Sequence, residues 1–315
     1  MKKIFGIITL FFFLGCDDGD IIFKDFNFGT ANIQSCTNNR LVLKVNGSQA
    51  LILDLDPAAF YNIETPEGQP RIITVNSTNR VLYRNYTSNV SASAFCSNNP
   101  LTSLPPVAEE WVALPGGTVT VETIKRFNEQ DVLVGYNHII RLSNITFTRG
   151  EETLVLQDND FGTFQKALGY TFDFLDDENN ILLNDCGGSA ERVFRVNGSE
   201  TLLFDLAAGT FSTTPGTVTV DLANTGDDNQ VVFTRYAGSA SNTFFCSSTP
   251  PVVPVTGQWF ATAGQLTVTT TEATAGGYNH VITLVNAVFS NTIGETIIVT
   301  NGTSPEYRIG TYNTN

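Results

Sequence analysis

Short apolar segments with period-two alternation, bounded by turn residues, recur along most of the chain. Residues 41–45 and 50–55 are two such segments, and Asn46-Gly47 lies between them. Alternation of this kind is typical of a β-strand with one buried face. Asn-Gly readily adopts the positive φ angles of a two-residue hairpin turn. The pattern therefore predicts a β-hairpin.

The same pattern predicts further strands in both halves of the chain. In the first half they span residues 71–76, 80–86, 117–124, 138–147 and 152–157. In the second half they span residues 192–196, 201–206, 217–222, 230–236, 265–271, 280–289 and 295–300. No segment combines a helical period with capping residues, so we expect little helix. About eight strands per half, separated by frequent turns, favour an all-β antiparallel sandwich.

The two halves repeat one another. Val45-Asn46-Gly47-Ser48 matches Val196-Asn197-Gly198-Ser199, Trp111 matches Trp259, and Gly135-Tyr136-Asn137-His138 matches Gly277-Tyr278-Asn279-His280. Ordered matches at a slowly drifting offset indicate a tandem duplication. We therefore expect two homologous β-sandwich domains, at residues 21–164 and 165–315, each large enough for its own core.

Four of the five cysteines fall into two pairs with the same spacing. Cys36 and Cys96 are 60 residues apart, as are Cys186 and Cys246. In an exported protein such pairs indicate disulfides, here one within each domain, because a bridge between repeats would break their equivalence. Closing a loop of this length stabilises a fold by roughly 4 kcal/mol. A metal or catalytic thiol would be the alternative, but CxxC spacing and a histidine nearby in sequence are absent.

The N-terminal segment has the pattern of a targeting signal. Met1-Lys2-Lys3 is followed by an apolar run from Ile4 to Leu14, which is too short to span a membrane and fits a secretory signal. Leu14-Gly15-Cys16 then resembles the lipobox of bacterial lipoproteins. That resemblance implies a signal peptide at residues 1–15 and lipid attached to Cys16. An ordinary cleaved signal with a chance cysteine is the alternative.

Acidic residues follow this cysteine. Asp17-Asp18-Gly19-Asp20 resembles the surface-export signal of Bacteroidota lipoproteins. The resemblance implies a short lipidated acidic tether at residues 16–20. It also implies an outer-membrane, lipid-anchored location exposed at the cell surface, with the membrane as partner through the lipid. Several acyl chains are needed for such an anchor, because a single chain binds a membrane only marginally.

Composition and charge argue against a disordered chain and against a nucleic-acid partner. Apolar residues make up 42% of the chain, which is too many for a disordered protein. The 17 Lys and Arg residues are outnumbered by 31 Asp and Glu residues, giving a net charge of −14. Nucleic-acid binding requires cationic neutralisation of phosphate, so this charge argues against a nucleic-acid partner.

The only two histidines occupy matching positions. His138 follows Tyr136-Asn137, and His280 follows Tyr278-Asn279. One interpretation is a core histidine, hydrogen-bonded at a strand entrance. The other is a ligand-binding patch in which Tyr, Asn and His from Tyr136 to His138 and from Tyr278 to His280 hold a glycan or a protein. No nucleophile in a recognisable motif accompanies either histidine, so we assign no catalytic residue.

Other chemistry is weakly indicated. Residues 158–160 and 176–180 are rich in carboxylates and amides but lack the spacing of a calcium loop, so we expect solvated loops, no metal and no cofactor.

The sequence favours a surface-anchored lipoprotein without enzymatic activity, with a binding, adhesion or envelope-structural role. The alternative is an extracellular hydrolase acting on polysaccharide or peptide, which would require two carboxylates facing a cleft for glycoside hydrolysis.

Overall fold

The computed structural model describes residues 28–29, 31–97, 100–129, 131–187, 192–224, 229–247, 249 and 251–315. Residues 1–20, with the predicted signal peptide, Cys16 and the acidic tether, lie outside the described residues. The chain divides into two compact units. Unit 1 consists of Met1–Phe60, Thr65–Thr123 and Asn137–Gln165, and unit 2 of Tyr61–Glu64, Ile124–Tyr136 and Lys166–Asn315.

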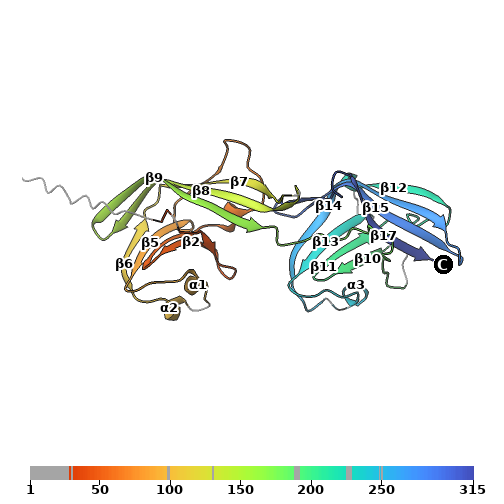
Figure 1. Cartoon of the computed structure of the whole chain (residues 1–315), viewed down its shortest axis with the longest axis horizontal. Helices are drawn as coiled ribbons and strands as arrows, with labels where there is room; N and C mark the ends of the chain where they lie inside the picture. The colour runs from red at the N-terminus through yellow and green to blue at the C-terminus, as the bar shows by residue number, and fades with distance from the viewer. Residues whose placement is uncertain are drawn as a thin grey trace, which may run out of the picture. The chain divides into compact units, whose positions relative to one another are not determined.

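The first sheet has nine antiparallel strands and carries two short helices (Figure 1). The strands are β1 (Gln34–Ser35), β2 (Leu41–Asn46), β3 (Gln49–Asp54), β4 (Arg71–Thr74), β5 (Arg80–Tyr86), β6 (Val107–Ala113), β7 (Thr118–Phe127), β8 (Leu133–Arg149) and β9 (Glu152–Ala167). Helices α1 (Ala92–Phe95) and α2 (Pro100–Ser103) follow β5, and a 3₁₀ turn, η1 (Pro57–Phe60), follows β3. The strand order is β1-β2-β3-β5-β6-β8-β7-β4, with β9 also paired to β8.

The second sheet has eight strands. They are β10 (Arg192–Asn197), β11 (Glu200–Asp205), β12 (Gly216–Asp221), β13 (Gln230–Tyr236), β14 (Val255–Glu272), β15 (Tyr278–Ser290), β16 (Thr296–Ile298) and β17 (Glu306–Thr314). Helix α3 (Thr243–Cys246) follows β13, and a 3₁₀ turn, η2 (Leu222–Asn224), follows β12. The order is β10-β11-β13-β14-β15-β16, with β12 on β14 and β17 on β15.

The two sheets have the same topology. The order β2-β3-β5-β6-β8 is repeated as β10-β11-β13-β14-β15. Strand β14 corresponds to β6 and β7 joined, because it pairs first with β13 and then with β12, as β6 pairs with β5 and β7 with β4. The predicted fold class, two homologous all-β antiparallel domains, is therefore confirmed.

Long strands pass from one layer of each sandwich to the other. In unit 2, β14 pairs with β13 through Phe260 and with β12 from Gln265 onward. Gly264, at φ +88°, lies at this crossing, opposite Asn286, at φ +48°. A Cβ on Gly264 would overlap the carbonyl oxygen of Asn286. Since Gly and Asn tolerate the left-handed region best, these two residue types permit the bend.

Unit 1 has the same crossing. Asn144 on β8 has φ +54°, and a Cβ on Gly117 would lie 2.7 Å from the carbonyl oxygen of Asn144. Figure 1 shows the outcome within the first sheet, where β7, β8 and β9 form one layer and β2, β5 and β6 the other. Each sandwich is thus one sheet folded back on itself.

Side chains on the inner faces of the two layers form the main core of each unit. In unit 1, Tyr83 and Trp111 of one layer cluster with Val121 and Ile140 of the other. In unit 2, Phe233 pairs with Trp259 in the same way, and they cluster with residues such as Leu266 and Ile282. Burying one such side chain contributes about 1.5–3 kcal/mol, so these layers hold together by apolar contact.

The outer face of the β2-β3-β5 layer carries a second, smaller core in unit 1. Leu43, Ile52 and Leu82 lie there beneath α1, which contributes Phe95. The disulfide Cys36–Cys96 ties the end of α1 to the residue after β1, and Cys186–Cys246 is its counterpart in unit 2. Both predicted disulfides are confirmed. Among the described residues, no helix has the length and hydropathy needed to cross a membrane.

Several strands were not predicted. Strand β6 was not predicted because Glu109 and Glu110 interrupt its apolar alternation. Strand β17 was not predicted because it contains one extra residue, Ile309, where its register with β15 shifts after the pair of Ile282 and Gly310. An extra residue of this kind breaks the period of two.

The layer crossing gives a test of the fold. Gly264→Ala should lower the free energy of unfolding of unit 2 by about 3 kcal/mol or more, because the new Cβ meets backbone atoms as well as an unfavourable φ. Gly209 has a similar φ of +84°, but no atom lies within 4 Å of the place that a Cβ would take there. Gly209→Ala should therefore cost only about 1 kcal/mol. Urea unfolding followed by circular dichroism measures both, and equal losses would contradict the proposed role of the crossing.

Candidate functional site

Both histidines lie inside the cores. His138 and His280 are fully buried. Nδ1 of His138 lies 2.9 Å from Oγ1 of Thr123, and Nδ1 of His280 lies 2.9 Å from Oγ1 of Thr270. Nε2 of His280 also lies 2.9 Å from Oγ1 of Thr314. Burial lowers the pKa of His280, because the charged imidazolium would lose its hydration.

Aromatic rings enclose each imidazole. Phe60 meets His138 edge-on at 5.7 Å between ring centroids, and Phe164 stacks on it at 5.8 Å. The matching rings in unit 2 are Phe211, edge-on to His280 at 5.3 Å, and Tyr312, stacked at 6.0 Å. The same cage around the same residue in both copies fits the interpretation of a core histidine.

The structure does not bring the three side chains of each predicted patch to one place. Consecutive residues of a strand point to opposite faces. Asn137 therefore points away from the face that carries Tyr136 and His138, and Tyr136 is itself buried. In β15, Asn279 likewise points away from the half-buried Tyr278 and from the buried His280. A ligand on one face could not contact all three side chains.

A cation recurs at matching positions of β2 and β10, buried as Lys44 and half-buried as Arg195. The ammonium group of Lys44 donates to the carbonyl oxygen of Phe28, and the guanidinium of Arg195 donates to that of Phe174. Lys44 also lies over the ring of Phe161. Burial lowers the pKa of Lys44, while the charge of Asp160 acts in the opposite direction. Because both cations satisfy backbone carbonyls, their role is structural.

The expectation of two solvated acidic loops is wrong: residues 158–160 lie within strand β9, and hydrogen bonds organise segment 176–180 around a buried carboxylate. Within residues 176–180 the buried Asp176 accepts hydrogen bonds from the backbone N–H groups of Asn180 and Ile181 and pairs with Arg308 at 3.0 Å. Burial would raise the pKa of Asp176, but these hydrogen bonds and Arg308 hold it below its usual value. In the part of the chain that the structure describes, no three His, Cys, Asp or Glu side chains group as metal ligands.

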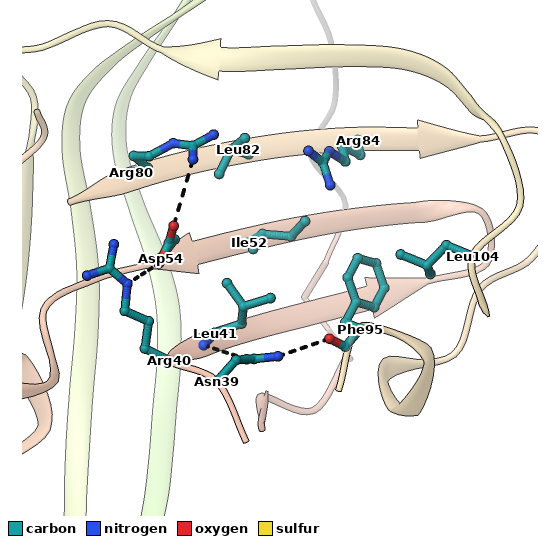
Figure 2. A pocket seen from close by; sticks show the side chains of 10 residues that line it. All are labelled: Asn39, Arg40, Leu41, Ile52, Asp54, Arg80, Leu82, Arg84, Phe95 and Leu104. Carbon is teal, nitrogen blue, oxygen red and sulfur yellow. Dashed lines mark hydrogen bonds and ion pairs between the residues drawn. The ribbon is translucent and has the colours of Figure 1, made fainter. Parts of the chain in front are cut away.

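A pocket of about 390 Å³ opens on the outer face of the β2-β3-β5 layer in unit 1 (Figure 2). Its apolar lining comes from Leu41, Ile52 and Leu82 of the sheet and from Phe95 and Leu104 of the segment that covers it. Its polar lining is Asn39, Arg40, Asp54, Arg80 and Arg84. The volume lies within the usual range of small-molecule sites.

Strand register explains how the pocket is built. Arg80, Leu82 and Arg84 alternate along β5, so all three side chains project to the outer face. Leu82 is paired with Ile52, and Arg80 is paired with Asp54. Asn39 ties the edge of the sheet to the cover, since its amide donates to the carbonyl oxygen of Phe95. An apolar row is thus flanked by a guanidinium at each end.

Three cations and one carboxylate give the pocket its charge. Asp54 lies between two arginines (Figure 2): Arg40 donates a hydrogen bond to it, and an Arg80 nitrogen lies 3.9 Å away. Arg84 pairs instead with Glu110 on β6. The group of Arg40, Asp54 and Arg80 therefore carries one net positive charge, while the Arg84 pair is balanced. In a chain with net charge −14 this is a local exception.

Unit 2 lacks this arrangement although its backbone matches. By strand register Gln230 takes the position of Arg80, and Thr234 that of Arg84. Arg192 takes the position of Leu41 and pairs with the retained carboxylate, Asp205, at 3.8 Å. The aliphatic pair of the floor is kept as Leu203 and Val232, but Phe194, at the position of Leu43, stacks on Phe245 at 4.4 Å between ring centroids. Among the described residues, arginine therefore occupies these two rim positions of the third strand in unit 1 alone.

Sequence reasoning missed the pocket residues. Segments 81–86 and 231–236 match one another, and the change from Arg84 to Thr234 is visible between them. The move of the arginine by one position, from Arg84 to Arg235, between otherwise matching strands was the available signal. What the sequence did not show is that β2, β3 and the covering helix meet β5 at this point.

Comparison of the chain with family models, with curated proteins and with solved structures found no match.

Burial of His280 gives a pH prediction. Its imidazole should protonate in the folded protein below the ordinary value of about 6.5, which an NMR titration measures directly. Because the folded pKa is the lower one, the stability present above pH 6.5 is lost as the pH falls towards the folded pKa. The urea midpoint of unit 2 should therefore fall on acidification. His280→Gln identifies the resonance, and protonation at or above 6.5 would contradict the burial of this side chain.

Proposed function

We propose that the chain is a non-catalytic binding protein of the cell envelope, anchored at the outer membrane through lipid on Cys16, which binds its ligand in the pocket of unit 1. The observation that carries the proposal is the difference between the copies. Two sheets of the same topology differ at Arg80 and Arg84, the positions that rim the pocket, where unit 2 has Gln230 and Thr234. In unit 2 Thr234 and Gln258 replace the cross-strand pair of Arg84 and Glu110, and Arg192 pairs with the retained carboxylate of Asp205. That sandwich therefore forms without arginines at the positions of Arg80 and Arg84.

The lining of the pocket favours binding over hydrolysis. Of the described residues that line it, only Asp54 is acidic, and this carboxylate is paired with Arg40 and Arg80. Glycoside hydrolysis by the usual route requires two carboxylates across a cleft, one of them able to donate a proton. The described lining therefore lacks the second carboxylate that this route needs.

The location rests on the N-terminal segment. Lys2 and Lys3, the apolar run and Gly15-Cys16 resemble a lipoprotein signal, and the acidic residues after Cys16 resemble a surface-export signal. A lipid-held protein with a pocket suits capture of a glycan, a protein or a small ligand at the envelope.

Binding without turnover can be tested on immobilised ligands. The chain from residue 16 onward, with Cys16→Ser, contains every residue that the structure describes and should be retained on at least one member of a panel of glycans, envelope peptides and immobilised small organic acids. The same polymers in solution should yield no cleavage products. Arg80→Gln with Arg84→Thr, which installs the residues of unit 2, should abolish retention because the cationic rim is lost. Cleavage without retention would overturn the proposal.

A matched control separates the pocket from general charge. Arg141→Gln removes a cation from the exposed side of β8, outside the pocket. This variant should be retained like the parent protein. Equal losses in Arg141→Gln and in the double variant would contradict binding in the pocket.

Lipid attachment has its own prediction. Expressed in a Bacteroidota host, the full-length chain should incorporate labelled fatty acid and sediment with the outer membrane, because several buried acyl chains anchor a protein stably. Cys16→Ser should lose the label and leave the membrane fraction. A Cys16→Ser variant that still sediments with the membrane would contradict anchoring by lipid.

A further inference from the structure

The charge in the pocket of unit 1 is distributed unevenly. Arg40, Asp54 and Arg80 lie at one end, and Arg84 with Glu110 lies at the other. Arg80 and Arg84 are four residues apart on one strand, a distance of about 13 Å along β5. The first end carries one net positive charge and the second carries none.

Arg80 is the guanidinium best placed to accept a new anion. Its side chain is 44% exposed, and its contact to Asp54 is long, at 3.9 Å. Arg40 is engaged more closely, since it donates to Asp54 and to the carbonyl oxygen of Thr78. A guanidinium has five N–H donors in a planar fork that matches an oxyanion. Asp54 holds the two arginines at one edge of the pocket.

The rest of the pocket favours an apolar ligand body. Ile52 and Leu82 form the floor beyond the charged end, and Phe95 and Leu104 close the far side (Figure 2). Phe95 packs edge-on against Tyr86, and this contact holds it at the margin of the floor. These four side chains supply no hydrogen-bond donor or acceptor, so this part of the pocket suits an apolar group.

We propose that this pocket binds a small organic monoanion, a carboxylate or sulfonate on an apolar body, with its oxyanion on Arg80 and Arg40 and its body along Ile52 and Leu82. The inference rests on the proposed binding function and specifies its ligand class. One net positive charge complements one anionic head, and a volume of about 390 Å³ suits a small molecule rather than a polymer chain.

Fluorescence titration with two related dyes tests this assignment. The probes are 1-anilinonaphthalene-8-sulfonate and N-phenyl-1-naphthylamine, which share an apolar body but differ in the sulfonate. The sulfonate dye should bind the parent chain, and Arg80→Gln should weaken it roughly tenfold, as expected for loss of one charge-assisted hydrogen bond. Arg141→Gln should change its affinity less than twofold, and the neutral dye should not respond to Arg80→Gln.

Unit 2 carries Gln at this position, so Arg80→Gln is compatible with the fold. Circular dichroism checks that the variant keeps its β structure.

Octanoate should displace the sulfonate dye, whereas octanol at the same concentration should not. Equal weakening in Arg80→Gln and Arg141→Gln would overturn the inference, as would equal displacement by octanol. Failure of both dyes and octanoate to bind, with retention on the glycan and peptide panel intact, would refute this ligand class alone. Absence of binding in both experiments would refute the proposed function as well.

Discussion

Both sandwiches depend on one backbone constraint, the passage of paired long strands from one layer to the other. In each unit an Asn in the left-handed region, Asn144 or Asn286, faces a Gly that has no room for a Cβ, Gly117 or Gly264. Without this bend each sheet would stay open and expose its apolar inner face. With it, one continuous sheet closes over its main core, and in unit 1 the outer face of the β2-β3-β5 layer carries both the smaller core and the pocket.

The division between inner and outer faces explains what the two copies share. The inner face of each unit is committed to packing, and there even a polar residue is kept, as His138 and His280 are with their Thr partners. On the outer face of β5 and β13 the copies differ, with Arg84 in one and Thr234 in the other. Duplication preserved the core, and the charged pocket lies where packing imposed the weaker constraint.

The sequence predicted what local pattern and repetition determine. The alternation in β5 and the repeated cysteine spacing sufficed for the strands and the disulfides. The pattern was insufficient for β6, where two Glu residues interrupt it, and β17, where an extra residue at Ile309 shifts the register. Identity between copies at His138 fits either a binding patch or a core residue, and burial favours the core. The pocket could not be predicted, because its lining residues lie far apart in the sequence and come together only through the order of the strands in the sheet. Examples are Arg40, Ile52, Arg80 and Phe95.

The central claim is that divergence on one outer face marks the ligand site of this protein. Backbone amide NMR shifts on addition of octanoate test it most directly, because they locate binding without any substitution. The shifts should concentrate on β2, β3, β5 and the α1 segment of unit 1, near Leu41, Ile52 and Leu82. Shifts centred instead on the matching face of unit 2, near Gln230 and Thr234, or on Tyr278 and Asn279, would contradict the claim.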